Sequence, residues 1–591
     1  MAEITYKYGR LGTQKKKRVQ AEDIEVSRND IRVLLLHPRR GEDFEVRCDL
    51  AYLNLSDPHP PPYYALSYCW GKEEPKFPIS LNGREHWVRP NLFDALQRLR
   101  DRDDVAGRFI WIDALCIDQD DEEEKGSQVD LMGEIYKKAS KTFIWLGEHE
   151  HASPLAMDLL NSVTEENLRD VLEDKSESKP MEQAWVALRA LFGRPYWSRV
   201  WILQEVVLSR PSYLICGNSM CPWDSVRLLL RSENFEVDKK NISVGSHHAR
   251  IALFDGNILP KLLVNIIDCR QTDAQKPEFW DYLVLSRQRN ASVAHDYIYG
   301  VMALMDPPAL RADYKKPVEE LYFEVVKHLV CLEKKIGVLS MCCETQAEDK
   351  AALNAAAVVG EGPGTSYANS LPSWVPDWRR RFKKDYQSRL LCKLKYSAGI
   401  AGPDAQPDIE CEPGSRTLRV RGVFVDSVTF VSPAKNLNRW PQVGEDWKTW
   451  TQHISESRNM YGSLEEQREA FRSTLQCQYH GSKTRNTDGS DQYFDIAVGR
   501  TEGSLVDPKR TFGKAGRQFF GTSNGYMGRG LDEVQAGDIV VVLLGAKVPF
   551  VLRECGHNSH YRLVGECYLH GIMNGEVVKD PTKELMDFYL V

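Results

Sequence analysis

The alternation of short apolar segments with amphipathic ones between residues 63 and 218 most constrains the fold of this chain. Four of the apolar segments have the length and the aromatic or β-branched content of buried strands: "YYALSYCW", "RFIWIDAL", "KTFIWLG" and "PSYLICGN". Between them, "NLFDALQRLR" and "GSQVDLMGEIYKKAS" repeat apolar residues at helical spacing. Strands that alternate with helices form a parallel sheet covered by helices. We therefore predict an α/β, doubly wound parallel sheet.

Three further features precede or interrupt this alternation. The segments "IRVLLLHP" and "FEVRCDLAYL" precede it and are typical of a two-stranded ribbon. The dipeptide Asn82-Gly83 lies between two alternating runs and predicts a β-hairpin inserted after the first strand. A third segment, "VLEDKSESKP" at residues 171–180, is acidic and polar and indicates a loop or a frayed helix.

The texture of the chain changes along its 591 residues, which is long enough for two or three domains. Periodic runs such as "PVEELYFEVVKHLVCL" indicate helices after the sheet, and alternating runs such as "TLRVRGVFVDSV" and "DIVVVLLGA" indicate strands near the C-terminus. We expect five parts: a flexible tail over residues 1–30, the α/β domain over 31–220, a helical domain over 221–345, a linker with a Trp/Pro segment over 346–414, and a β-rich domain over 415–591.

Composition excludes several classes of protein. The net charge of -7 gives no overall basic surface for nucleic acid. No segment approaches the ~18 apolar residues of a membrane span, and the N-terminus lacks a signal peptide, so we expect a cytoplasmic protein. The 14 cysteines include no CxxC pair, which favours free thiols. The nearest imitations of a metal site, "HEH" at 149–151 and "CGHNSH" at 555–560, lack further ligands at suitable spacing, so we expect polar loops and no metal.

Polar and aromatic residues follow the first two predicted strands of the sheet. Because the carboxyl ends of parallel strands share one edge, where ligands bind, these residues are candidates for a binding site. They are Ser67, Tyr68, Trp70, Gly71, Asp113, Cys116, Asp118 and Gln119. Each also has a structural interpretation: a strand end, a core residue, a turn or a helix cap. For Cys116 a buried thiol is favoured over a nucleophile, because no histidine lies in the nearby motifs.

The segment "RPYWSRVWILQEVVLS", from Arg194 to Ser209, predicts one amphipathic helix. Glu205 lies four residues after Trp201, at the edge of its apolar face, so we expect Glu205 to be half-buried. Burial beside aromatic rings would raise the pKa of this carboxyl group, and a cation such as Arg199 would lower it. The sequence leaves both outcomes open, as it does a purely structural salt bridge.

Three blocks in this order resemble the fungal heterokaryon-incompatibility (HET) domain: "YYALSYCWG", the stretch from "WIDALCIDQDDEEEKG" to "KTFIWLGE", and "RPYWSRVWILQEVVLSRPSYLICG". Later segments, "HDYIYGVMAL", "LPSWVPDW" and "YRLVGECYLHGIM", resemble the extended architecture of many HET proteins. The HET domain is in turn similar to Toll/interleukin-receptor (TIR) domains. This resemblance implies a flavodoxin-like order of strands and a role in fungal non-self recognition and programmed cell death, a form of innate immunity.

The similarity to TIR domains also implies a chemistry, because some TIR domains are NAD+ glycohydrolases. Their catalytic glutamate, four residues after a Trp, corresponds to Glu205, and Trp201 or Trp70 could stack on a ring of the nucleotide. NAD+ would be a substrate, and no cofactor is expected. The resemblance further implies an incompatibility partner protein and assembly into a homo-oligomer on activation.

Two alternatives remain. The domain could be a non-enzymatic TIR-like adaptor in which Glu205 only holds the fold, or a nucleotide-binding switch that does not hydrolyse. The inserted hairpin, the long segment between Glu148 and Arg194, and the lack of a GxGxxG motif after the first strand all depart from the TIR pattern.

Overall fold

The computed structural model divides the chain into two compact units, Met1–Lys316 and Pro317–Val591. The boundary between the units falls within residues 221–345, the expected helical domain. Some helices of that segment therefore belong to unit 1 and others to unit 2. The residues that the structure describes are 29–39, 41, 45–173, 179–230, 263–264, 267–268, 277–305, 310–342, 371–380, 396–400, 406–411, 414–432, 460–477, 517–556 and 559–591. The expected tail, apart from its last two residues, and most of the expected linker lie outside them.

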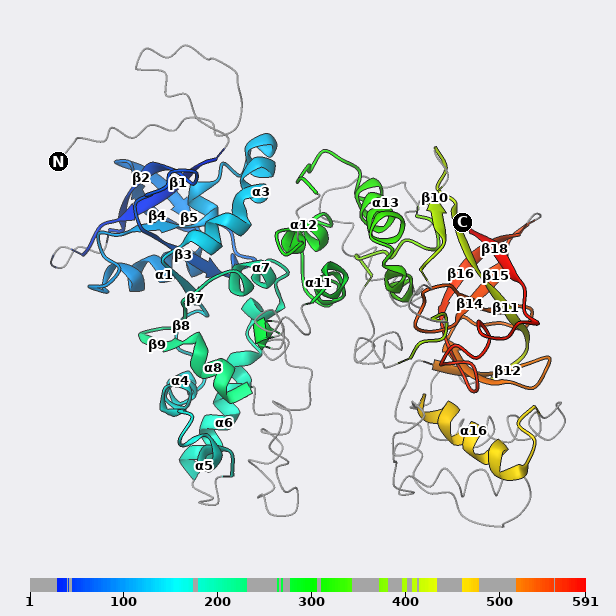
Figure 1. Cartoon of the computed structure of the whole chain (residues 1–591). Coiled ribbons are helices and arrows are strands. Elements are labelled where there is room, and N and C mark those ends of the chain that lie inside the picture. Colours follow the sequence, from blue (N-terminus) through cyan, green and yellow to red (C-terminus); the bar gives the residue numbers. More distant parts are fainter. Residues whose placement is uncertain are drawn as a thin grey trace. The chain divides into compact units, whose positions relative to one another are not determined.

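The described residues of unit 1 form a nine-stranded mixed sheet in the order β5-β4-β2-β1-β6-β3-β7-β8-β9 (Figure 1). Its strands are β1 (Asp30–Leu36), β2 (Arg47–Asn54), β3 (Tyr63–Tyr68), β4 (Phe77–Leu81), β5 (Arg84–Val88), β6 (Phe109–Trp111), β7 (Lys141–Trp145), β8 (Ser212–Cys216) and β9 (Ser219–Pro222). The four strands expected from the alternation, β3, β6, β7 and β8, are parallel to one another and lie side by side. The prediction of an α/β protein with a parallel sheet is confirmed for this part of the sheet.

The remaining strands make the sheet mixed. β1 and β2 form the expected antiparallel ribbon, and β1 pairs antiparallel with β6. β4 and β5 form the expected hairpin, and Asn82 and Gly83 both have positive φ angles, of 53° and 70°. Such angles at both central residues match the right-handed twist of the flanking strands.

Helices lie on both faces of the parallel strands. Within the described residues, the helices of unit 1 include α1 (Pro90–Arg100), α2 (Asp113–Cys116), α3 (Glu122–Lys138), α4 (Ser153–Ser162), α5 (Leu168–Glu173), α6 (Lys179–Phe192), the 3-10 helix η1 (Pro195–Ser198), α7 (Ile202–Val207), α8 (Trp223–Leu230), α11 (Phe279–Ser286) and α12 (Asp296–Met302). Side chains alternate along a strand. Tyr63 and Ser67 of β3 bond to residues of α3 and α7, whereas Trp145, opposite Tyr68, bonds to Asn91 of α1.

The helix expected from Arg194 to Ser209 is wrong as a single element. The structure has η1, then an extended Arg199 with φ -72° and ψ 141°, then the short helix α7. The interruption arises because residues 198–200 pair with Asn290: its backbone N–H donates to the carbonyl of Ser198 at 2.5 Å, and its carbonyl accepts from Val200 at 3.0 Å. A partner ninety residues away therefore breaks a pattern that is helical by itself.

The segment at 171–180 is partly described. Helix α5 ends at Glu173 and helix α6 begins at Lys179, and residues 174–178 lie outside the described part. Together α4, α5 and α6 account for most of the long segment between Glu148 and Arg194.

Unit 2 begins with helical elements and is otherwise built around a second sheet. Its elements in the described part of the chain are α13 (Val318–Lys327), the π-helix η3 (His328–Leu332), the 3-10 helix η4 (Ile336–Met341), β10 (Ile409–Cys411), β11 (Leu418–Val431), α16 (Leu464–Gln476), β12 (Arg517–Thr522), β13 (Met527–Leu531), β14 (Ile539–Leu543), β15 (Phe550–Glu554), β16 (His560–Glu566), β17 (Tyr568–Leu569) and β18 (Leu585–Leu590). The expected β-rich C-terminal region is confirmed. The long strand β11 pairs with β18, β14 and β12, so it joins the whole sheet.

The segment "LPSWVPDW" packs inside unit 2. Trp374 and Trp378 are fully buried and contact Phe323 and Tyr322 of α13. The indole of Trp374 donates to the carbonyl of Arg416, 2.9 Å away, just before β11. The segment thus connects α13 to the sheet. Among the described residues of both units, no helix is long and apolar enough to cross a membrane.

Candidate functional site

Glu205 lies on α7 and is more deeply buried than expected, with 1% of its surface exposed. Its backbone N–H donates to the carbonyl of Trp201, so the spacing that suggested one helical turn is present in α7. The helix contacts both β3 and α3. Glu205 therefore sits between the sheet and the helical layer, at the carboxyl end of the first parallel strand.

A chain of hydrogen bonds leads to the Glu205 carboxylate. The hydroxyl of Ser67, at the end of β3, donates to Oε2 of Glu205. The hydroxyl of Tyr196, in η1, lies 2.7 Å from the Ser67 hydroxyl. Because a serine hydroxyl has one proton to donate, Tyr196 must donate to Ser67 when Ser67 donates to Glu205. Burial, together with the charge of Glu205, raises the pKa of Tyr196, which keeps its proton in place.

Arg199 provides the positive charge of the site. Its Nη1 lies 3.5 Å from Oε2 of Glu205 and donates to the carbonyl oxygen of Tyr68. Burial disfavours the charged guanidinium, but Glu205 and Asp113 outweigh that effect and raise the pKa of Arg199. The Arg199 side chain is 16% exposed, so it lies between the buried carboxylate and the surface. The extended backbone at Arg199 makes this placement possible.

Asp113 is a second carboxylate at the same rim. It is the first residue of α2, directly after β6, and accepts hydrogen bonds from the indole of Trp70 at 2.9 Å, from the N–H of Ala114 at 2.7 Å and from the hydroxyl of Tyr68. Burial raises the pKa of Asp113, and Arg199 and these donors oppose the rise. Arg199 thus interacts with two carboxyl groups that come from different helices, α7 and α2.

Burial also decides the electrostatic question that the sequence left open at Glu205. Removal from water raises the pKa of its carboxyl group, while Arg199 and the Ser67 hydroxyl lower it, and the net direction is upward. Asp113 adds to the rise. Glu205 therefore takes up a proton more readily than an exposed glutamate does.

Trp201 is held by a helix far along the chain. Its indole donates to Oδ2 of Asp296 in α12, 3.1 Å away, and the hydroxyl of Tyr314 donates to the other oxygen of that carboxylate at 2.9 Å. Gly300 of α12 lies so near to residue 200 that a Cβ atom at this position would be 3.1 Å from both methyl groups of Val200. The segment "HDYIYGVMAL" therefore packs directly against the beginning of α7.

The other residues selected from the sequence lie nearby but take part less directly. The amide of Gln119 donates to the carbonyl of Asp113 at 3.1 Å. Asp118 is half-buried, and its N–H donates to Glu124 at 2.7 Å. Gly71 is exposed, with a φ of 78° suited to glycine. Cys116 is completely buried, which raises the pKa of its thiol to about 12, so the interpretation as a buried thiol fits.

Sequence reasoning missed Tyr196 and Asp296 and gave Arg199 no defined place. Both residues lie within otherwise apolar patterns. In such a pattern a tyrosine is ordinarily interpreted as a core residue, and an aspartate as an acid at the end of a helix. Arg199 carried one usable signal, since a charged residue in the middle of an apolar helical pattern needs a partner. The identity of that partner required the fold.

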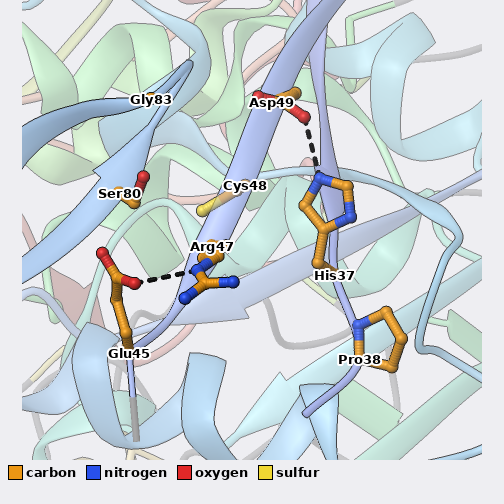
Figure 2. A pocket seen from close by; sticks show the side chains of 8 residues that line it. All are labelled: His37, Pro38, Glu45, Arg47, Cys48, Asp49, Ser80 and Gly83. Atoms are coloured by element: carbon orange, nitrogen blue, oxygen red, sulfur yellow. Dashed lines mark hydrogen bonds and ion pairs between the residues drawn. The ribbon is translucent and has the colours of Figure 1, made fainter. Parts of the chain in front are cut away.

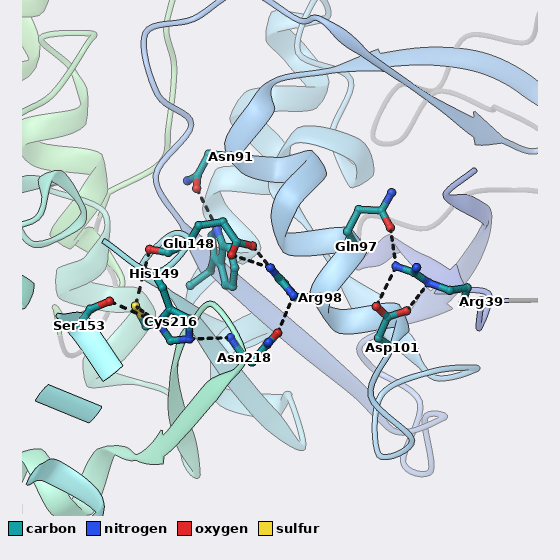
Figure 3. A network of polar contacts seen from close by, with 11 residues as sticks. Arg39, Asn91, Gln97, Arg98, Asp101, Glu148, His149, Ser153, Cys216 and Asn218 are labelled. Atoms are coloured by element: carbon teal, nitrogen blue, oxygen red, sulfur yellow. Dashed lines mark hydrogen bonds and ion pairs between the residues drawn. The ribbon is translucent and has the colours of Figure 1, made fainter. Parts of the chain in front are cut away.

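The carboxyl ends of β7 and β8 are held by a separate polar network (Figure 3). Arg98 of α1 binds both oxygens of Glu148, at 2.7 and 2.8 Å, and also Asn218, at 2.6 Å. Nε2 of His149 accepts from the backbone N–H of Asn218, so this histidine of the "HEH" motif acts in a loop contact. In the described part of the chain, no three His, Cys, Asp or Glu side chains are grouped to hold a metal ion.

A hollow of about 230 Å³ lies elsewhere in unit 1, along β1, β2 and the β4–β5 hairpin (Figure 2). His37 and Asp49, whose Nε2 and Oδ2 atoms are hydrogen-bonded at 2.8 Å, line it together with Glu45 and Arg47. In the order of the sheet, β1 and β6 separate β2 from β3. The hollow is therefore not part of the rim that carries Glu205.

Comparisons with known proteins agree with the architecture. Residues 63–205 match the family "Heterokaryon incompatibility protein (HET)", a match that ends at Glu205, and residues 456–591 match the "Het-6 beta-barrel domain". The chain is 23% identical to "Heterokaryon incompatibility protein 6, OR allele" of Neurospora crassa, over 95% of this chain and 96% of that protein. No solved structure matches. Both family matches and the relative support a role in heterokaryon incompatibility, and the chain is a heterokaryon-incompatibility (HET) domain protein.

Proposed function

We propose that the HET domain of this protein hydrolyses NAD+ at its N-glycosidic bond, with Glu205 as the catalytic residue, and that this reaction serves cell death in heterokaryon incompatibility. The observation that carries the proposal is the buried Glu205 carboxylate, fixed by Ser67 at the carboxyl end of the first parallel strand.

The order of the parallel strands supports this position as a ligand site. Taken in chain order, the four strands lie as second, first, third and fourth, because β6 neighbours β3 and β7 follows on its other side. This is the order of flavodoxin-like sheets, in which ligands bind outside the carboxyl ends near the first and third strands. Ser67 and Glu205 lie at that point, and the TIR-like resemblance is consistent with it.

The chemistry suits a single carboxylate. The nitrogen of nicotinamide in NAD+ is already cationic, so it leaves as a neutral base when the bond to the ribose carbon breaks, and no general acid is needed. Water then attacks the oxocarbenium-like carbon, giving ADP-ribose and releasing a proton. Glu205 would stabilise the developing positive charge and bind a ribose hydroxyl. Trp70 or Trp201 would stack on a ring, and Ser67, Tyr68 and Asp113 would orient the ribose or the phosphates.

Access to Glu205 requires a change that includes movement of Arg199. Its carboxylate is 1% exposed, and the Arg199 guanidinium lies over it. For a ribose to contact Glu205, the Arg199 side chain must move away from Oε2, and its charge would then face the phosphates. Assembly into a homo-oligomer, or binding of an incompatibility partner protein, is the trigger that we propose for this change.

Release of nicotinamide tests the proposal. Wild-type protein should release nicotinamide from NAD+ at high protein concentration or with a crowding agent, and Glu205→Gln should reduce the rate at least about a hundredfold, since it removes the charge that stabilises the transition state. Glu134→Gln, an exposed glutamate on α3, is the matched control and should keep full activity. A folded Glu205→Gln protein as active as wild type would exclude the catalytic role.

A non-enzymatic adaptor is the second candidate, and the burial of Glu205 favours it. If the hydrogen bonds from Ser67 and the Arg199 contact serve only to hold α7 on the sheet, wild-type protein releases no nicotinamide under any of these conditions. In that case Glu205→Gln would retain toxicity when expressed in fungal cells, whereas the enzymatic function requires that it lose toxicity.

A further inference from the structure

Arg289 is a buried arginine for which the described residues accept only some of the possible hydrogen bonds. It follows α11 and has none of its surface exposed. Its Nη1 donates to the carbonyl oxygen of Trp197, 2.5 Å away. Its Nε and Nη2 have no hydrogen-bond acceptor within the part of the chain that the structure describes. Burial lowers the pKa of Arg289 to about 9, because a cation removed from water is unfavourable.

The two unused donors form a specific edge of the guanidinium group. Nε and Nη2 point in the same direction and bind two oxygens of one anion with parallel hydrogen bonds. Other arginines of this protein use that edge on carboxylates: Arg98 holds Glu148 at 2.7 and 2.8 Å, and Arg39 holds Asp101 at 2.8 and 2.9 Å (Figure 3). Arg289 presents the same edge with neither oxygen supplied by the described residues.

The surroundings of Arg289 connect this edge to the Glu205 site. Tyr196 is near enough to influence the pKa of Arg289, and its hydroxyl leads through Ser67 to Glu205. The next residue, Asn290, is bonded to residues 198 and 200 through its backbone. Its side chain also donates to the Ser198 hydroxyl at 2.9 Å. Arg289 is thus fixed against the segment that carries Tyr196 and Arg199.

We infer that Arg289 is an anion-binding residue whose Nε–Nη2 edge binds a phosphate group. A phosphate offers two oxygens at the spacing of this edge and the negative charge that the buried guanidinium lacks. The phosphate could be inorganic or could belong to a nucleotide. The inference does not depend on cleavage of NAD+, because it concerns binding alone.

Thermal unfolding of the full-length protein tests the inference with two probes, inorganic phosphate and ADP-ribose, at constant ionic strength in chloride. Each probe that binds should raise the Tm of wild type to a plateau. Arg289→Met should weaken the response at least about tenfold, which is the effect of losing hydrogen bonds to a charged group. In chloride alone, Arg289→Met should have a Tm equal to or above that of wild type, because an apolar side chain replaces an unpaired charge.

Two further variants separate binding from a structural role. Arg289→Lys keeps the charge without the two-donor edge, and should fold and bind more weakly. Arg32→Met is the matched control, since Arg32 is equally buried but is paired with Glu124; it should lower the Tm and keep the phosphate response. A response to both probes identifies a site for free phosphate, and a response to ADP-ribose alone identifies a nucleotide site.

Two results would overturn the inference. One is a wild-type protein whose Tm responds to neither probe. The other is an Arg289→Met protein that loses as much stability as Arg32→Met while its response to phosphate is unchanged. Neither result depends on nicotinamide release, so this inference and the proposed function can fail separately.

Discussion

Two glutamates of unit 1, Glu124 at the start of α3 and Glu205 on α7, are both almost completely buried but are held in different ways. Glu124 forms an ion pair with Arg32, which is itself 1% exposed, and also accepts the N–H of Asp118 at 2.7 Å. Glu205 accepts a hydrogen bond from the hydroxyl of Ser67, and the guanidinium of Arg199 lies 3.5 Å away. The Arg199 side chain is partly exposed to solvent.

The difference distinguishes a structural carboxylate from one that can change its contacts. The partner of Glu124 is itself held by the fold, because Arg32 also donates to the carbonyl of Cys116 and so ties β1 to the end of α2. The cation next to Glu205 belongs to Arg199, whose side chain is 16% exposed, and the pKa of Glu205 is raised by its burial. The following predictions test this contrast, from the largest expected effect to the smallest.

Breaking the ion pair of Arg32 and Glu124 should have the largest effect on stability. Glu124→Gln removes the carboxylate that is paired with the buried Arg32, and the free energy of unfolding should fall by about 3–5 kcal/mol. Urea denaturation of full-length protein measures the change. Replacing both partners together, Arg32→Met with Glu124→Leu, should recover most of the loss, since no charge is then left unpaired. A loss below about 1 kcal/mol in Glu124→Gln would show that this pair is not structural.

Replacing the other glutamate should have the opposite sign and should depend on pH. The pKa of Glu205 is higher in the folded protein than in the unfolded chain, so the stability linked to its proton is present at low pH and is lost as the pH rises through the folded pKa. Glu205→Gln lacks this loss. The free energy of unfolding of this variant relative to wild type should therefore increase with pH and then level off. The total increase should be about 1.4 kcal/mol for each unit by which the pKa of Glu205 is raised.

The exposed control defines the baseline of that measurement. Glu134 on α3 is 47% exposed and lies near Lys137 and Lys138, so the difference between Glu134→Gln and wild type should stay nearly constant over the same pH range. A Glu205→Gln difference that is equally flat would mean that burial does not shift this group. Together with lost activity, a gain in stability would mark Glu205 as a residue kept at the expense of stability.

The smallest effect is expected at the end of the hydrogen-bond chain. Tyr196→Phe removes the hydroxyl bonded to Ser67 and keeps the ring, which packs edge-on against Trp197. The free energy of unfolding should decrease by about 1 kcal/mol, the usual value of one hydrogen bond. Tyr64→Phe, whose hydroxyl makes an exposed contact at 3.3 Å to Asp104, should change it by much less. Equal losses in both variants would argue against the chain.

Elements with a strong local pattern could be predicted from the sequence, and contacts between distant segments could not. The strands β3, β6, β7 and β8 are short apolar runs between helical ones, and their patterns do not depend on the rest of the chain. The break at Arg199 depends on Asn290, which lies outside any local window. The helical spacing of apolar residues around Arg199 is real, but the prediction of a single helix over this segment is wrong.

The candidate site shows the same division. Ser67 and Glu205 were selected because strand ends and the Trp201 to Glu205 spacing are visible in the sequence, and the structure brings these two residues into contact. The depth at which Glu205 is buried was underestimated, because α3, α7 and β3 together cover it and no single segment reveals this. The turn of η1 brings the hydroxyl of Tyr196 to the hydroxyl of Ser67, and this turn is not visible in the sequence pattern.

The bridge from Asn290 to residues 198 and 200 also determines how much of this protein can be studied as an independent domain. The family match stops at Glu205, yet Arg199 owes its conformation to Asn290, and Trp201 is bonded to Asp296. A fragment that ends near residue 220 would lose both contacts and would present a different Glu205 environment. Recombinant work on the site should therefore retain the chain through Lys316, the end of unit 1.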